Sequence, residues 1–157
     1  LFAPGKFQFR EGSLVFCVEN QGVSLWGIPE AYLALDNPPV VRSCNEETLE
    51  WVRDHDRLSD FFITFTYWQA VNGGLPNVAI KGNASASTFE IVEEKWPEIK
   101  LGPNDWKLRF FGSNAEIICI VGEDQIQTAA STANALRRIT ELIGIDWDYE
   151  EYEDELE

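Results

Sequence analysis

The sequence predicts a fold that combines antiparallel β-hairpins with helices, and three observations support this. Residues 14–28 contain two apolar runs around a short polar insert that ends in Gly22, which is typical of a β-hairpin. Residues 106–111 and 115–121 form a second apolar pair around a Gly-Ser-Asn turn. Residues 59–71 and 128–143 are long segments with helix-like apolar spacing.

The first hairpin is predicted to lie in the centre of a sheet. Both of its faces are mostly apolar, so helices or loops should cover it on both sides. With residues 20–22 as the loop, Glu19 lies beside the turn at the rim. The expected cross-strand pairs are Leu14 with Ile28, Phe16 with Trp26 and Val18 with Ser24.

Residues 59–71 are predicted to form a buried helix. Ser59 can cap it, Asp60 favours its positive end, and Gly73 can end it. A strand is the alternative, because the segment is rich in β-branched and aromatic residues; its length favours the helix.

The remaining elements are assigned from shorter patterns. Short strands are expected at residues 7–10, 40–41 and 89–92, a central strand at 115–121 and a loop at 72–87. The helix over residues 128–143 should end at Gly144.

The C-terminal segment, residues 146–157, contains eight carboxylates. Such runs usually form solvated tails. Here Ile145, Trp147 and Tyr149 alternate with acids, a pattern that favours an edge strand, and we expect Trp147 and Tyr149 to anchor it on the domain. The candidate partner-binding residues are Glu19, Asp148, Glu150, Glu151, Glu153, Asp154 and Glu155.

Composition narrows the class of function. The chain has 157 residues, which suits one domain, and a net charge of −15 from 27 acidic and 12 basic residues. This balance argues against binding to nucleic acid or to anionic membranes, because both need a Lys/Arg surface. Three cysteines give no self-contained disulfide framework, and Cys17 and Cys119 fit buried positions, so we expect a reducing, cytoplasmic location. The chain begins at Leu1 and contains no Met, so we expect its natural start upstream.

Candidate chemistry is sparse. His55 is the only histidine and lies among charged residues 53–57, where we expect surface salt bridges rather than catalysis. One histidine and three scattered cysteines do not make a zinc site, and the glycines lack the phosphate-loop pattern. The sequence therefore predicts no catalytic, metal or cofactor site.

The order of motifs over residues 14–69 resembles the SUKH superfamily, which joins yeast cell-wall assembly regulators to bacterial immunity proteins of polymorphic toxin systems. The matching motifs are Glu19-Asn20-Gln21-Gly22, Trp26-Gly27-Ile28, Pro38-Pro39-Val40, Leu58-Ser59-Asp60-Phe61-Phe62 and Tyr67-Trp68-Gln69. The resemblance implies an α+β fold, with a mostly antiparallel central sheet and helices packed against it, as a single domain over residues 1–157. The acidic segment 146–157 is not a family signature, and the family's N-terminal Leu-Pro element is missing.

The resemblance also implies a binding protein rather than an enzyme. The expected function is that of an immunity-type protein, which neutralises a basic toxin, such as a nuclease, by stoichiometric binding. A nuclease holds phosphates with Lys and Arg, and clustered carboxylates can occupy the same groove. The alternative is a regulatory or scaffolding SUKH domain without a toxin partner, as in the yeast branch.

Overall fold

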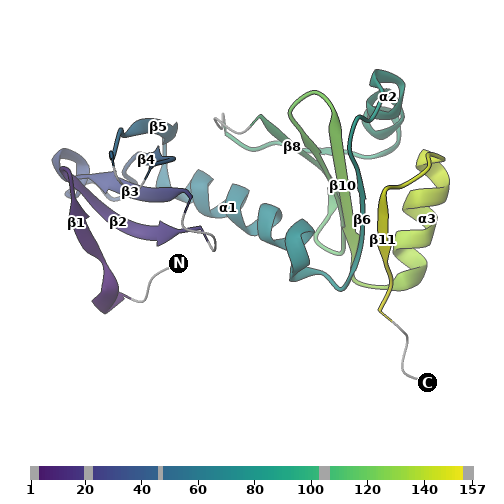
Figure 1. Ribbon diagram of the computed structural model, residues 1–157, viewed down its shortest axis with the longest axis horizontal. Helices are drawn as coiled ribbons and strands as arrows, with labels where there is room; N and C mark the ends of the chain where they lie inside the picture. The colour runs from purple at the N-terminus through teal and green to yellow at the C-terminus, as the bar shows by residue number, and fades with distance from the viewer. Residues whose placement is uncertain (1–3, 20–22, 46–47, 103–106, 154–157) are drawn as a thin grey trace. The chain divides into compact units, whose positions relative to one another are not determined.

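A computed structural model describes residues 4–19, 23–45, 48–102 and 107–153, and the predicted α+β class is confirmed (Figure 1). Where the resemblance implied one central sheet, the described residues form two, and every strand pair in them is antiparallel. The chain divides into two compact units: unit 1 is Leu1–Ile63 with Gly102–Asp105, and unit 2 is Thr64–Leu101 with Trp106–Glu157.

Unit 1 contains a five-stranded sheet in which each strand pairs with its neighbours in the chain. Its strands in spatial order are β1 (Gln8–Arg10), β2 (Ser13–Val18), β3 (Leu25–Pro29), β4 (Val40–Ser43) and β5 (Val52–His55). The hairpin β2–β3 lies in the interior of this sheet, as predicted. The short 3₁₀ helices Pro4–Lys6 and Glu30–Tyr32 flank the first strands.

The register of the first hairpin is only partly as predicted. The observed partners are Leu14 with Ile28, Val15 with Gly27, Cys17 with Trp26 and Val18 with Leu25. The expected pairs of Phe16 with Trp26 and Val18 with Ser24 are wrong, because a bulge shifts the register between Val15 and Cys17. With both strand faces apolar, the alternation of side chains does not reveal one inserted residue. The expected loop, residues 20–22, lies outside the described residues.

Helix α1 (Leu58–Gln69) confirms the helical interpretation of its segment. Asn37 and Pro38 supply the cap expected from Ser59: the Leu58 N–H donates to the Pro38 carbonyl at 2.7 Å and the Ser59 N–H donates to Asn37 Oδ1 at 3.0 Å. These contacts satisfy helix donors that have no partner within the helix. The helix is followed by a short irregular turn, Ala70–Gly74, in which Gly73 has a φ of 99°.

Phe61 of α1 lies at the centre of the core of unit 1, with 1% of its surface exposed. Its ring meets Phe16 edge-on, with 5.3 Å between ring centroids, and lies 5.9 Å from Trp26. The bulge in β2 therefore does not remove Phe16 from the core; the residue packs on the helix.

Unit 2 is built on a six-stranded sheet. Its strands in spatial order are β11 (Tyr149–Glu151), β6 (Asn77–Lys81), β10 (Gln125–Ala130), β9 (Glu116–Val121), β8 (Leu108–Ser113) and β7 (Glu98–Ile99). The β8–β9 pair is the predicted second hairpin, although Trp106 lies outside the described residues. Strand β9 is interior, as its unbroken apolar run predicted.

Two local predictions for residues 72–92 of unit 2 are wrong. Residues 72–87 are not all loop, because β6 lies within them. Residues 89–92 belong to helix α2 (Ala86–Lys95), which begins at Ser85, whose side chain accepts from the Thr88 N–H. The Ser85 cap stabilises a helical start, and the apolar pattern of residues 89–92 that suggested a strand lies within this helix.

The last helix, α3 (Ala133–Ile143), is shorter than predicted. Residues 128–130 belong to β10 instead, since Thr132 caps the helix by accepting from the Ala135 N–H. Gly144 ends the helix in the left-handed conformation, as predicted.

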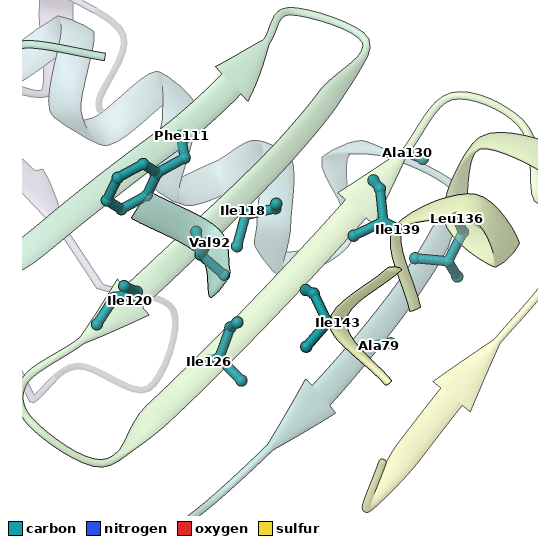
Figure 2. Packing of buried hydrophobic residues seen from close by; sticks show 10 residues of the cluster. All are labelled: Ala79, Val92, Phe111, Ile118, Ile120, Ile126, Ala130, Leu136, Ile139 and Ile143. Carbon is teal, nitrogen blue, oxygen red and sulfur yellow. The ribbon is translucent and has the colours of Figure 1, made fainter. Parts of the chain in front are cut away.

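Both faces of the sheet in unit 2 are covered. Helices α2 and α3 place Val92, Leu136, Ile139 and Ile143 on one face, where Ile118, Ile120 and Ile126 meet them (Figure 2). On the other face, Ile117, Cys119 and Ala129 pack with Val71 and with partly buried residues of α1 such as Tyr67 and Trp68. The two-sided burial explains why β9 carries apolar residues at successive positions.

Replacing Gly112 with Ala should destabilise unit 2 far more than replacing Gly122 with Ala. Both have positive φ, but a Cβ at Gly112 would lie 2.2 Å from the Glu116 carbonyl oxygen, whereas one at Gly122 meets nothing within 4 Å. We expect a loss of about 3 kcal/mol for Gly112→Ala and about 1 kcal/mol for Gly122→Ala in urea unfolding. Equal losses would contradict the close approach of Gly112 in β8 to the Glu116 carbonyl of β9.

Candidate partner-binding surface

The structure brings four of the seven predicted binding residues together at one edge of unit 2. Asp148, Glu150, Glu151 and Glu153 lie on β11 or beside its ends, and β11 is an edge strand of that sheet (Figure 1). Glu19 is exposed after β2 in unit 1 and is not part of this group. The other two, Asp154 and Glu155, lie outside the described residues. The acidic edge, Asp148–Glu153, is therefore a defined structural element, as the alternation in the sequence predicted.

Asp148 fastens the start of this segment to the end of β6. Its carboxylate accepts from Lys81 Nζ at 2.6 Å and from the Gly82 N–H at 2.8 Å, and its own N–H donates to the Ile80 carbonyl at 3.0 Å. The Lys81 hydrogen bond, helped by that of Gly82, lowers the pKa of Asp148. Asp148 is thus an attachment point as well as a surface charge.

The far end of the segment is held by different contacts. The Glu153 N–H donates to Asn77 Oδ1 at 2.9 Å, and the Arg137 guanidinium lies 5.1 Å from the centroid of the Tyr152 ring. Trp147 packs against the apolar core, as predicted. Tyr149, the other expected anchor, is 48% exposed, so that expectation is wrong: an edge strand has no neighbour on its outer side to cover the ring.

Two tyrosines hold the side chains of the acidic edge. The Tyr149 hydroxyl donates to Glu151 Oε2 at 2.6 Å, and the Tyr152 hydroxyl donates to Glu150. The Glu151 contact raises the pKa of Tyr149; burial, followed by the Glu150 contact, raises that of Tyr152. Within the described part of the chain, no ion pair involves Glu150, Glu151 or Glu153. The carboxylates of Glu150 and Glu151 are consequently held in position but not paired with a cation.

Sequence reasoning missed the residues that hold the acidic edge: Asn77, Lys81, Gly82 and Arg137. The first three lie in a segment that we predicted to be loop, more than sixty positions from their partners along the chain. A local pattern cannot reveal pairing at that separation, because only the folded sheet brings the segments together.

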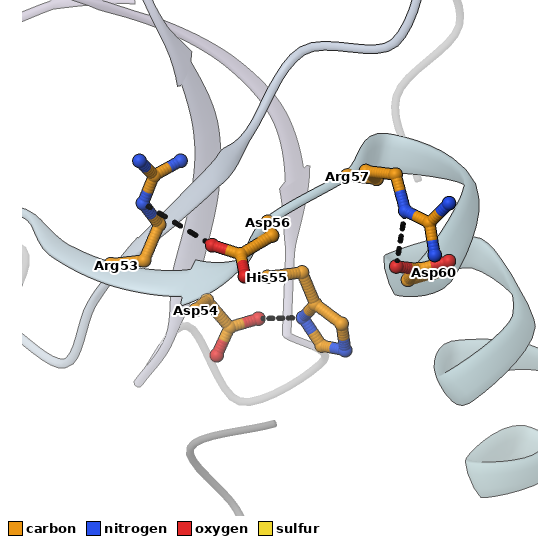
Figure 3. A network of polar contacts seen from close by, with 6 residues as sticks. All are labelled: Arg53, Asp54, His55, Asp56, Arg57 and Asp60. Atoms are coloured by element: carbon orange, nitrogen blue, oxygen red, sulfur yellow. Dashed lines mark hydrogen bonds and ion pairs between the residues drawn. The ribbon is translucent and has the colours of Figure 1, made fainter. Parts of the chain in front are cut away.

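The predicted surface cluster around His55 is wrong in part (Figure 3). Arg53–Asp56 is an exposed ion pair, as expected, and the exposed Arg57 pairs with the partly buried Asp60, but Asp54 and His55 are only 4% and 3% exposed. A register shift in the β4–β5 pair leaves Asp54 as the extra residue between the partners of Val40 and Val41. Such a bulge lets two successive side chains point inward, which strict alternation would forbid.

The buried pair forms a polar contact inside unit 1. His55 Nδ1 lies 2.8 Å from Asp54 Oδ2, and Asp54 Oδ1 lies 3.6 Å from Arg42 Nε. The His55 ring also meets Phe61 edge-on, with 5.6 Å between centroids. A ring in this setting holds the neighbouring carboxyl group and packs on the helix.

Cys17 and Cys119 are free and buried, as predicted, and burial raises the pKa of both thiols; Cys44 is free and exposed. The part of the chain that the structure describes contains no group of three or more His, Cys, Asp or Glu residues suited to a metal ion. Among the described helices, none has the length and apolarity needed to cross a membrane.

Comparison with family models, with curated proteins and with solved structures finds no match to this chain. Membership of the SUKH superfamily therefore stays a prediction from the motifs over residues 14–69.

The attachment of the acidic edge should be visible in the titration of Asp148. Because the folded state lowers the pKa of Asp148, the contact stabilises the fold at pH values above the ordinary aspartate pKa of about 3.9. This stabilisation is lost as the pH falls through the lower pKa of the folded state. In the Lys81→Met variant the Asp148 midpoint, followed by carboxyl ¹³C shifts, should move up toward the ordinary value. An unchanged midpoint would refute the role of Lys81.

The buried Asp54–His55 contact should matter more than the exposed pairs beside it. His55→Ala removes the partner of a buried carboxyl group and a ring packed on Phe61, so the free energy of unfolding should fall by about 3 kcal/mol. Asp56→Asn, at a side chain that is 74% exposed, should change it by less than about 0.5 kcal/mol. Comparable urea midpoints for the two variants would argue against the buried contact.

Proposed function

We propose that this chain is an immunity-type binding protein that neutralises a basic toxin domain by stoichiometric binding. The acidic edge carries the proposal: it is an ordered group of carboxylates, held in place by hydrogen bonds, on a chain with a net charge of −15. The motif order over residues 14–69 supports a partner of the toxin type.

The acidic edge has two properties that favour a cationic protein partner. Its excess negative charge steers a basic surface toward it and speeds association, an effect that salt weakens. Its Glu150 and Glu151 side chains are already held by Tyr152 and Tyr149, so less side-chain freedom is lost on binding. Among basic toxins, a nuclease fits well, since its phosphate-binding Lys and Arg residues match such carboxylates.

The binding test uses the product of the gene next to the one encoding this chain. We expect growth rescue on co-expression, and a 1:1 complex with a Kd of about 1 μM or tighter at physiological salt by calorimetry. A weaker Kd, or no rescue, would refute the proposal. A neighbourhood without a toxin gene would instead favour the regulatory or scaffolding alternative.

Removing charge from the acidic edge should weaken the complex more than removing the same number of charges elsewhere. The triple variant Glu150→Gln, Glu151→Gln and Glu153→Gln should weaken binding about tenfold or more, mainly through slower association, and should flatten the salt dependence. Side-chain substitution is preferable to truncation after Gly144, because truncation would also remove Trp147, which packs against the core.

The matched control removes three charges elsewhere in unit 2. Glu90, Glu94 and Glu141 are exposed on α2 and α3 and form no ion pair among the described residues, so their change to Gln gives the same net charge. If both triple variants bind alike, net charge alone attracts the partner and the acidic edge is not its binding surface.

A further inference from the structure

The outer side of β11 presents backbone groups that β6 does not use. Strand β11 lies at the end of its sheet and pairs with β6 alone among the described strands, in the register Tyr149 with Ile80, Glu150 with Ala79 and Glu151 with Val78. All three residues of β11 are exposed. A sheet edge of this kind can pair with a further strand.

The register identifies which backbone groups face outward. In an antiparallel pair, two opposed residues either both direct their N–H and C=O groups toward each other or both direct them away. The Ile80 carbonyl accepts from Asp148, so the polar groups of Ile80 face β11. Those of the next residue, Ala79, therefore face the other way, and so do those of its partner, Glu150.

The pairing of β6 with β10 shows independently that the backbone groups of Glu150 face outward. The Ser131 N–H donates to the Ala115 carbonyl, which places the odd-numbered backbone groups of β10 toward β9. Its even-numbered groups, including those of Thr128, then face β6, where Thr128 opposes Ala79. Ala79 is thus engaged with β10, and the N–H and C=O of Glu150 point away from the sheet.

We propose that the acidic edge binds its partner by strand addition: a basic extended segment pairs with β11 through the Glu150 N–H and C=O. This proposal rests on the proposed function and specifies how the partner binds. Backbone pairing supplies the docking geometry, and side chains supply the selectivity.

Charge complementarity decides the kind of segment. Successive residues of a strand point to opposite faces, so Glu150 and Glu151 place one un-neutralised carboxylate on each face of the edge. A segment with Lys or Arg on both faces can approach both, while an acidic segment is repelled. The exposed Tyr149 ring offers an adjacent apolar contact, with 48% of its surface accessible. The competing explanation for these charges is protective: carboxylates on an edge strand can serve only to prevent its pairing with other strands.

Two peptide probes separate strand addition from charge attraction. The first is the acetylated, amidated hexapeptide Lys-Lys-Val-Val-Lys-Lys, which as a strand places lysine on both faces. The second replaces both valines with proline, which keeps the charge but removes two backbone N–H donors and lowers strand propensity. In ¹H–¹⁵N NMR titrations of the full chain, the valine peptide should bind about fivefold or more tightly than the proline peptide. At saturation it should slow hydrogen exchange of the Glu150 amide about tenfold, and the proline peptide should not.

Variants at Glu150 test the backbone contact itself. Glu150→Pro and Glu150→Ala both remove the carboxylate, but only the proline variant also removes the outward N–H. An edge strand tolerates proline at a position whose N–H faces away from the sheet. The proline variant should bind the valine peptide about fivefold more weakly than the alanine variant. Persistence of the Gly82 and Glu153 amide signals in the proline variant would show that β11 remains attached to β6. If the proline detaches β11, hydrogen exchange of the Glu150 amide in the unaltered chain is the test of strand addition.

Equal binding of the two peptides, an unprotected Glu150 amide at saturation, or no binding at about 5 mM peptide would each overturn strand addition. Failure here is distinct from failure of the proposed function. A toxin that is neutralised equally well by the proline and alanine variants refutes strand addition alone. A chain that neutralises no toxin refutes the immunity function, whatever the peptides do.

Discussion

The hydrogen bonds that fasten residues 148–153 to β6 are the constraint on which the acidic edge depends. Asp148 binds Lys81 and the Gly82 N–H at one end, and the Glu153 N–H binds Asn77 at the other. Between these points the segment becomes the last strand of a sheet. An acidic run that would otherwise repel itself in solution is thereby held as an ordered surface, and the partly buried Trp147 beside it packs against the core.

In unit 1 the corresponding constraint is the burial of Phe61 against the sheet. The ring contacts Phe16 and His55, and each of these lies at a register shift, in the β2–β3 and β4–β5 pairs respectively. Bulges bend a strand and redirect side chains, so they allow residues that alternation would separate to share one face. The same geometry takes Asp54 and His55 out of solvent and leaves the Arg53–Asp56 ion pair exposed.

These features bear on function through preorganisation. A free acidic tail would lose conformational freedom on binding, whereas carboxylates that tyrosine hydroxyls already hold lose less. The sheet edge adds a direction to the attraction, because backbone groups pair only along the strand. In the proposed complex, charge would attract a basic partner to the acidic edge, and the register of β11 would determine how the partner's strand aligns.

The sequence by itself determined the α+β class, the two hairpins, a helix close to the predicted residues 59–71 and the edge strand near the C-terminus, because these follow from local apolar spacing and capping. Tertiary structure alone decided the division into two sheets, the bulges at Phe16 and Asp54, and the pairing of β6 with β11. It also placed His55 in the core and gave Asp148 its partners. The physical reason is that a bulge changes register by one residue without altering composition, and that long-range sheet pairing joins segments whose local patterns carry no information about each other.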